Sequence, residues 1–158
     1  PSRNYELLNM NEILEDVVRL MDTKGSITLK LDPALDKVCV TGDKDEVKRA
    51  LINIIKNSVQ AIDEIEDVKL KGKVNIQSLK MNGFYSVKIK DNGVGMDEDT
   101  QQKLFEPYFS TKSSGMGLGL VITKKILDDM KAAIKVQSSR TNGTEVEINF
   151  KISEKVTE

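Results

Sequence analysis

Residues 73–96 read KVNIQSLKMNGFYSVKIKDNGVGM and hold the clearest structural pattern of the chain. Apolar and polar side chains alternate through residues 73–81 and 84–90, on either side of Asn82-Gly83. Because Asn-Gly is a preferred pair for a tight hairpin turn, the pattern predicts two adjacent antiparallel strands. The second strand runs into residues 91–96, where closely spaced glycines predict a turn.

Helices and further strands are predicted on both sides of this hairpin. A capping-box-like start at Asn9 opens a helix that ends at Gly25, and residues 43–65 form the strongest helical pattern of the chain. Shorter elements are strands at 26–31 and 37–41, a capped helix at 97–105, and strands at 134–138 and 145–152 around the turn Asn142-Gly143. A loop at 106–115 leads into a second long helix at 117–130. This order predicts an α+β fold, a two-layer sandwich in which helices cover one face of a mixed, mostly antiparallel sheet.

The composition narrows the class of protein. With 158 residues the chain is long enough for one domain with its own core. A net charge of −1 without a basic stripe argues against nucleic-acid binding, and no apolar run approaches the length of a membrane span. The single Cys39 predicts a buried strand residue in a reducing, cytoplasmic setting. The sequence contains no His, so it cannot supply an imidazole for catalysis or phosphorylation.

Four polar residues share one face of the helix predicted at 43–65. At about 100° per residue, Asn53, Lys56, Asn57 and Gln60 fall within an arc of about 100°. This arc fits the solvated side of an amphipathic helix. Asn is a poor helix former, however, so two Asn residues one turn apart also favour a second interpretation, in which their oxygens reach a hard cation.

The turn at residues 91–96 is the second candidate. Gly93 and Gly95 permit positive φ values and let a flat ligand approach the backbone. The carboxylate of Asp91 can accept a hydrogen bond from an adenine amino group. The alternative is an Asx-turn that only ends a strand.

A third candidate lies where a loop enters the helix predicted at 117–130. Residues 115–120 read GMGLGL, and backbone N–H groups at such a helix start favour bound phosphate, although a flexible hinge has the same composition. The spacing matches neither the Rossmann fingerprint nor a P-loop. In the preceding segment, aromatic side chains can anchor a mobile lid and Lys112 can reach phosphate oxygens.

The order of these motifs resembles that of a known family. Asn-x-x-x-Asn, Asp-x-Gly-x-Gly, Phe-x-Pro-x-Phe, Gly-x-Gly-x-Gly and Gly-Thr follow one another as in the catalytic domain of sensor histidine kinases. The resemblance covers residues 9–152 and extends to the ATPase superfamily of gyrase, Hsp90 and MutL, whose Bergerat ATP-binding fold is a two-layer α/β sandwich. The stretch at 107–112 looks most like the nitrogen-regulation group of these kinases.

The resemblance also divides the chain into three segments. We expect residues 1–8 to be a linker from a dimerisation and phosphoacceptor domain, 9–153 to be the ATP-binding catalytic domain and 154–158 to be a frayed tail. Pro1 in place of Met is typical of an excised or processed segment. The segment is expected to be monomeric and cytoplasmic, with no membrane contact of its own, while its parent protein can still be membrane-anchored.

The resemblance implies a role for each matching residue. Asp91 would bind the adenine amino group, with Thr144 assisting through water, and Asn57 would ligate Mg²⁺. Asn53, Lys56 and Lys112 would act in catalysis beside the phosphates. The set implied to bind ATP is Asn53, Lys56, Asn57, Asp91, Gly93, Gly95, Met96, Phe109, Thr111, Lys112, Gly115, Met116, Gly117, Leu118, Gly119, Leu120 and Thr144, and Phe105 and Phe109 would anchor the lid.

The reaction follows from the same resemblance. Gyrase and Hsp90 carry a water-activating Glu at the position of Asn53, and an amide cannot accept a proton at neutral pH. We therefore expect the chain to hold ATP and to donate its γ-phosphoryl group to a His on a separate dimerisation domain, upstream of a response regulator. A related serine kinase or ATPase, and a nucleotide-sensing module without transfer, are the alternatives.

One stretch departs from the family pattern. The helix predicted at 117–130 usually ends in His-Gly-Gly in these kinases, whereas this chain has Met130-Lys131-Ala132. A residue other than Gly in a left-handed helix cap costs about 1 kcal/mol. We therefore expect the end of this helix to be shaped differently.

Overall fold

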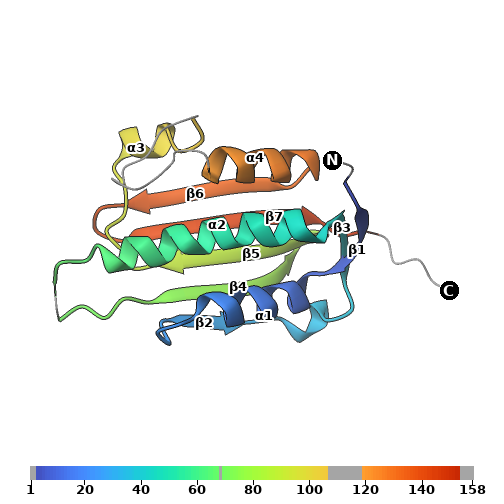
Figure 1. Cartoon of the computed structure of the whole chain (residues 1–158), viewed down its shortest axis with the longest axis horizontal. Coiled ribbons are helices and arrows are strands. Elements are labelled where there is room, and N and C mark those ends of the chain that lie inside the picture. Colours follow the sequence, from blue (N-terminus) through green and yellow to red (C-terminus); the bar gives the residue numbers. More distant parts are fainter. Residues whose placement is uncertain (1–2, 68, 107–118, 154–158) are drawn as a thin grey trace.

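The computed structural model describes residues 3–67, 69–106 and 119–153 (Figure 1). Five strands form the main sheet, in the order β2 (Ile27–Lys30), β4 (Val74–Met81), β5 (Phe84–Asp91), β7 (Gly143–Lys151) and β6 (Ala133–Ser139). β2 pairs with β4 in parallel, and the remaining neighbours pair antiparallel. A smaller sheet joins β1 (Tyr5–Asn9) to β3 (Cys39–Asp43).

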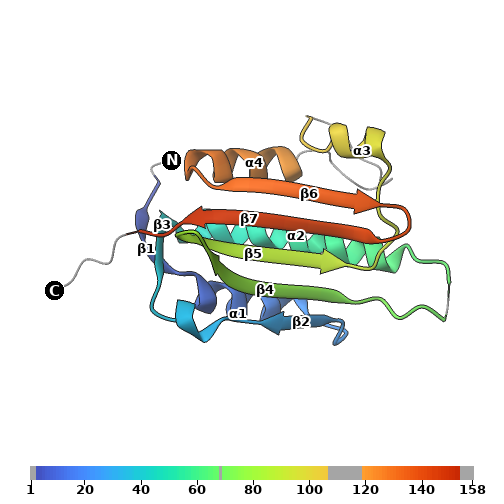
Figure 2. The ribbon, with the colours of Figure 1, turned by 180° about the vertical axis from the view of Figure 1, so that it is seen from behind.

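Three helices lie on one face of the main sheet (Figure 1). They are α1 (Met10–Met21), α2 (Lys44–Asp63) and α4 (Gly119–Asp129), and the view from behind shows the opposite face without helices (Figure 2). The short helix α3 (Glu98–Gln102) lies beside β6, and a 3₁₀ turn at Pro33–Leu35 follows β2. This arrangement confirms the predicted two-layer α/β sandwich. Among the described residues, no helix is both long and apolar enough to cross a membrane.

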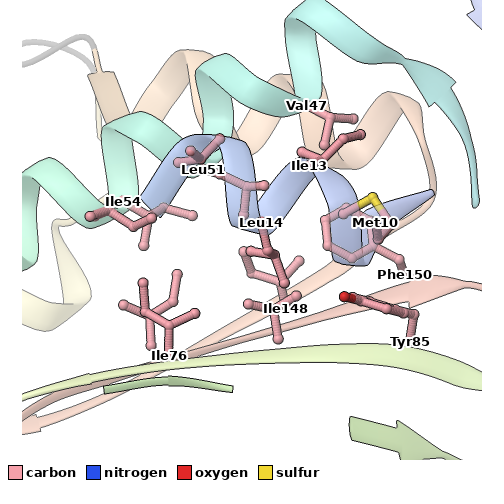
Figure 3. Close-up of a cluster of buried hydrophobic side chains, with 14 of the residues drawn as sticks. Met10, Ile13, Leu14, Val47, Leu51, Ile54, Ile76, Tyr85, Ile148 and Phe150 are labelled. Atoms are coloured by element: carbon pink, nitrogen blue, oxygen red, sulfur yellow. The ribbon is translucent and has the colours of Figure 1, made fainter. Parts of the chain in front are cut away.

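The core lies between the helices and the sheet (Figure 3). Because side chains alternate along a strand, β4, β5 and β7 each turn every second residue toward the helices. Burial of each large apolar side chain contributes about 1.5–3 kcal/mol. The labelled core residues are Met10, Ile13 and Leu14 from α1, Val47, Leu51 and Ile54 from α2, and Ile76, Tyr85, Ile148 and Phe150 from the sheet.

Helices α1 and α2 each begin at a polar cap, and the cap of α1 is the Asn9 that the sequence indicates. The side chain of Asn9 accepts a hydrogen bond from the Glu12 N–H at 3.2 Å. The carboxylate of Asp43 accepts hydrogen bonds from two N–H groups in the first turn of α2, at 3.0 and 3.1 Å. Each cap satisfies N–H groups that have no partner inside the helix, so the polar side chain fixes where the helix starts. α1 ends at Met21, before the predicted boundary at Gly25.

Residues 3–8 contact the rest of the described structure. Residues 5–8, which the sequence places in a linker, form most of β1 and pair with β3. Arg3 extends this connection, because its guanidinium contacts Glu46 at 3.3 Å and also pairs with Asp129 at the end of α4. The pKa of Asp129 is held below its usual value, chiefly by the hydrogen bond from Arg3.

Three local expectations need correction. The closing turn is the three-residue loop 140–142, and Gly143 already pairs with Ser139, so Asn142-Gly143 is not the turn itself. α4 ends in the usual left-handed cap, because Lys131 adopts a φ of 60° and the Ala132 N–H donates to the Leu127 carbonyl at 2.8 Å. The expectation of a differently shaped helix end was therefore wrong. Cys39 is in a strand as predicted, but it is only half-buried.

Candidate functional site

A row of four residues crosses the main sheet at one end. Val74 on β4 pairs with Asp91 on β5, Asp91 pairs with Thr144 on β7, and Thr144 pairs with Ser138 on β6. Residues directly opposite each other on neighbouring strands point to the same face. Val87, Ile89, Val146 and Ile148 alternate into the core, so the row lies on the face that the helices cover. Asp91 is 2% exposed, which makes it a buried carboxylate at the edge of the core.

The turn after Asp91 is held close to its neighbours by glycine. The carboxylate of Asp91 accepts a hydrogen bond from the Gly93 N–H at 2.9 Å, which is the Asx-turn contact. A Cβ atom at Gly93 would lie 2.6 Å from the Cβ of Ala61 on α2. Gly95 has a φ of 67°, and a Cβ there would lie 1.9 Å from the Ser139 carbonyl oxygen. Both positions therefore require glycine if the turn is to pack between α2 and β6.

Ser138 connects this turn to β7. Its hydroxyl accepts a hydrogen bond from the Met96 N–H at 2.8 Å, lies 2.6 Å from the Thr144 hydroxyl and donates to the Gly143 carbonyl at 3.0 Å. Gln101 of α3 completes the connection. Its side-chain amide donates to the Ser138 carbonyl at 2.7 Å and accepts from the Ser138 N–H at 3.1 Å. Met96 and Gln101, which follow the turn, are thus attached to Ser138 of β6, and β6 pairs with β7, the strand opposite Asp91.

A line of side chains on α2 leads to the same turn. Asn53, Asn57 and Ala61 follow at intervals of four residues, so they lie on one side of the helix. At one end of this line, the Asn53 amide donates to the buried Thr123 hydroxyl of α4 at 3.4 Å. At the other end, the Ala61 carbonyl accepts from the Val94 N–H at 3.2 Å. Asn57 lies between these two contacts and is half-buried, whereas Lys56 is exposed beside it.

Charged groups line the outer rim of the turn. Asp97 caps α3 by accepting from the Thr100 N–H at 2.8 Å, and its carboxylate lies 3.5 Å from the Arg140 guanidinium. The hydrogen bond from Thr100 is the main cause of a pKa for Asp97 below its usual value, with Arg140 contributing in the same direction. Asp97 therefore stays ionised at neutral pH and keeps α3 capped next to the turn.

The structure places part of the predicted site. It brings Asp91, Gly93, Gly95, Met96 and Thr144 into one cluster beside α2. Asn53 and Asn57 lie along the adjoining helix, and Gly119 and Leu120 begin α4. Phe105 is half-buried and follows α3. The predicted residues Phe109, Thr111, Lys112, Gly115, Met116, Gly117 and Leu118 lie outside the described residues.

Sequence reasoning missed two members of this cluster. Ser138 and Gln101 each make several hydrogen bonds within it, but neither belongs to a motif that the sequence analysis singled out. A lone Ser in a strand and a Gln in a short polar helix have many structural explanations. The only available signal for Ser138 was its place opposite Thr144, and that place depends on the loop length between β6 and β7.

Comparison with known proteins agrees with this geometry. The model of the histidine kinase-, DNA gyrase B- and HSP90-like ATPase family matches residues 42–154. Sporulation kinase B of Bacillus subtilis (strain 168) is 33% identical over 148 residues, which are 92% of this chain and 33% of that protein. The signal transduction histidine-protein kinase AtoS of Escherichia coli (strain K12) is 32% identical over 140 residues, 85% of this chain and 22% of that protein.

A solved structure is similar over nearly the whole chain. The nucleotide-free catalytic domain of histidine kinase ThkA has a TM-score of 0.78 at 28% identity, covering 94% of this chain and 95% of its own. The chain belongs to the histidine kinase-, DNA gyrase B- and HSP90-like ATPase family, within which it has the fold of the catalytic, ATP-binding domain of sensor histidine kinases. The chain spans about a third or less of the length of the curated relatives named above. The nitrogen-regulation subgroup stays a prediction.

Proposed function

We propose that this chain binds Mg-ATP at the turn after β5 and donates the γ-phosphoryl group to a His of a separate dimerisation domain. The observation that carries the nucleotide site is the pairing of Asp91 with Thr144 beside the glycine turn. Asp91 offers a buried carboxylate to the adenine amino group, and Gly93 and Gly95 let the turn after Asp91 pack closely between α2 and β6. Met96, the last residue of the turn, adds an apolar side chain to the proposed adenine pocket.

The phosphates would lie along α2, toward α4. Asn53 and Asn57 share the side of α2 that runs from the contact with Thr123 to the contact with the turn. Lys56, exposed one position before Asn57, supplies positive charge for the phosphates, and Lys112 is proposed to do the same from outside the described residues. The backbone of residues 115–119, together with Leu120 at the start of α4, would hold the phosphate chain.

Asn57 fits the role of magnesium ligand. Its carboxamide oxygen is a hard donor of the kind Mg²⁺ accepts, and Mg²⁺ in phosphoryl-transfer sites is commonly held by one or two side chains together with the phosphates. Asn57 is half-buried within α2, so the helix fixes the position from which its side chain extends. When bound with the nucleotide, Mg²⁺ neutralises charge on the phosphate oxygens.

The residue at position 53 favours transfer over hydrolysis. A carboxylate there could activate water, but the Asn53 amide cannot accept a proton at neutral pH, and it donates to Thr123. Phosphoryl transfer needs mainly positioning and charge neutralisation, so an incoming imidazole can act as its own nucleophile. The sequence has no His, and the curated relatives are several times longer than this chain. The acceptor is therefore proposed to lie on a dimerisation domain of the parent protein, and a response regulator would take the phosphoryl group from that His in the cytoplasm.

A reconstitution experiment tests this function. The chain is incubated with γ-labelled ATP, Mg²⁺ and a separately purified helical-hairpin domain that carries the acceptor His. We expect label on that domain, and no label on the same domain with its His replaced by Ala. Label that appears instead on Ser or Thr of a protein partner, or free phosphate released at a rate independent of the hairpin domain, would contradict the proposed transfer.

A further inference from the structure

Ser138 holds three polar contacts with a single hydroxyl group. The Met96 N–H points to its oxygen at 2.8 Å, the Gly143 carbonyl lies 3.0 Å away, and the Thr144 hydroxyl lies 2.6 Å away. A Ser hydroxyl has one proton to donate and two lone pairs that accept. It can therefore satisfy all three contacts, but only with one assignment of protons.

The assignment follows from what each partner can do. The Met96 N–H can only donate, so it uses one lone pair of Ser138. The Gly143 carbonyl can only accept, so it uses the single Ser138 proton. The Thr144 hydroxyl must then donate its own proton to the second lone pair of Ser138. Thr144 has no proton left to donate and meets any further partner as an acceptor.

We propose that Ser138 is a positioning residue for nucleotide selection, because it fixes the Thr144 hydroxyl as an acceptor beside the Asp91 carboxylate. This inference rests on the proposed adenine site. Adenine carries a 6-amino group, which donates, whereas hypoxanthine and guanine carry a 6-oxo group, which accepts. Two acceptors on neighbouring strands favour the amino group and are mismatched to the oxo group. Asp91 alone supplies part of this selection, and Ser138 adds to it through Thr144.

Gln101 keeps Ser138 in place. Its side-chain amide makes two hydrogen bonds with the backbone of Ser138, one as donor and one as acceptor. Ser138 is thereby held between α3 and β7 while its hydroxyl reaches Met96. If Ser138 moved out of reach of Thr144, the Thr144 hydroxyl could rotate and donate its proton to another partner. The selection against a 6-oxo purine would then be lost.

The test compares ATP with ITP by isothermal titration with the full chain and Mg²⁺. ITP has a 6-oxo group in place of the 6-amino group and carries a proton on N1. We expect Ser138→Ala to lower the ratio of ATP affinity to ITP affinity about three- to tenfold, because the freed Thr144 hydroxyl can then donate to a 6-oxo group as well as accept from a 6-amino group. Ser138→Thr keeps a hydroxyl and should keep the ratio near that of the parent. Thermal unfolding of each variant checks that the fold is intact.

A second variant controls for the possibility that Ser138→Ala acts by disturbing the turn at residues 91–96. Thr144→Val removes the hydroxyl but leaves the contacts of Ser138 with Met96 and Gly143 available. It should lower the ATP to ITP ratio to the same extent, and adding Ser138→Ala to it should lower the ratio no further. A merely structural role for Ser138 would weaken both nucleotides equally, and an unchanged ratio in Ser138→Ala would overturn the inference.

The outcome also separates this inference from the proposed function. If ATP binding depends on Asp91 but the ATP to ITP ratio is insensitive to Ser138, only the role of Ser138 is overturned. If the parent chain binds no ATP, or binds it equally well after Asp91→Ala, the adenine site and the role of Ser138 are both overturned.

Discussion

Asp91 and Thr144 face each other across β5 and β7, and the glycine before Thr144 makes their approach possible. Gly143 has a φ of 76°, and a Cβ atom there would lie 2.1 Å from the Asp91 carbonyl oxygen. The strand pair that carries the two proposed base-binding side chains can therefore form only with glycine at position 143. The Gly-Thr motif thus combines a packing requirement with a polar side chain for the site.

Replacing Gly143 should damage the fold far more than replacing another glycine of similar φ. We expect Gly143→Ala to destabilise the chain by about 2–4 kcal/mol, because the left-handed conformation costs about 1 kcal/mol and the clash with β5 adds to it. Gly83→Ala is the control, since Gly83 has a φ of 82° with nothing within 4 Å of an added Cβ. Urea unfolding measures both. Equal losses in the two variants would mean that the close approach at Gly143 is not needed.

Gln101 and Gln102 form a matched pair for testing the attachment of α3. Gln101→Glu keeps the acceptor for the Ser138 N–H but replaces the donor to the Ser138 carbonyl with a negative oxygen. Gln102→Glu adds the same charge at an exposed neighbour. We expect Gln101→Glu to lower ATP affinity about threefold to tenfold and to speed amide hydrogen exchange in residues 98–102. If the two variants behave alike, the attachment does not support the site.

The magnesium assignment makes its own prediction. Asn57→Ala should bind ATP with an affinity that no longer responds to Mg²⁺, because the carboxamide oxygen that would hold the ion is lost. Asn75→Ala, an exposed Asn on β4, is the control and should respond as the parent does. Isothermal titration with and without Mg²⁺ measures the response. A full Mg²⁺ response in Asn57→Ala would contradict the assignment of Asn57.

The backbone of Lys131 is strained, and a single substitution should relieve this strain. It adopts a left-handed φ of 60° in the cap of α4, where glycine is the usual residue. Lys131→Gly should raise the free energy of unfolding by about 0.5–1 kcal/mol, whereas Lys131→Ala keeps the Cβ atom and should raise it little. Equal stabilisation by both variants would attribute the effect to the Lys side chain instead of the backbone.

The elements with strong local patterns were predictable from the sequence. The alternation around Asn82-Gly83 predicted β4 and β5 with their turn, the capping-box-like start at Asn9 predicted the start of α1, and the helical pattern of residues 43–65 predicted α2. β1 was missed because it is a short strand whose only fully buried side chain is Leu8, while Tyr5 and Leu7 are 40% and 48% exposed. The residues of its partner β3 lie thirty or more positions away in the sequence, so no local pattern predicts the pairing.

The candidate site was predictable only where a motif is continuous in sequence. Asp91, Gly93 and Gly95 stand together, so their turn was found, and Asn53 and Asn57 were found by helical spacing. Ser138 required the register of β6 and β7. A two-residue turn at Asn142-Gly143 would have placed Thr141 opposite Thr144, whereas the loop 140–142 places Ser138 there. The length of the loop between β6 and β7 depends on backbone geometry and packing. Neither can be read from the residue types of the loop.

The most direct test of the central claim is the affinity of Mg-ATP for Asp91→Ala, measured by isothermal titration beside the parent chain. Asp99→Ala, which removes an exposed carboxylate from α3, is the matched control. The proposed site predicts that Asp91→Ala weakens binding by about 1.5–3 kcal/mol, the usual contribution of a hydrogen bond to a charged group, while Asp99→Ala binds as the parent does. An Asp91→Ala variant that remains folded and binds Mg-ATP with unchanged affinity would show that the adenine is recognised elsewhere.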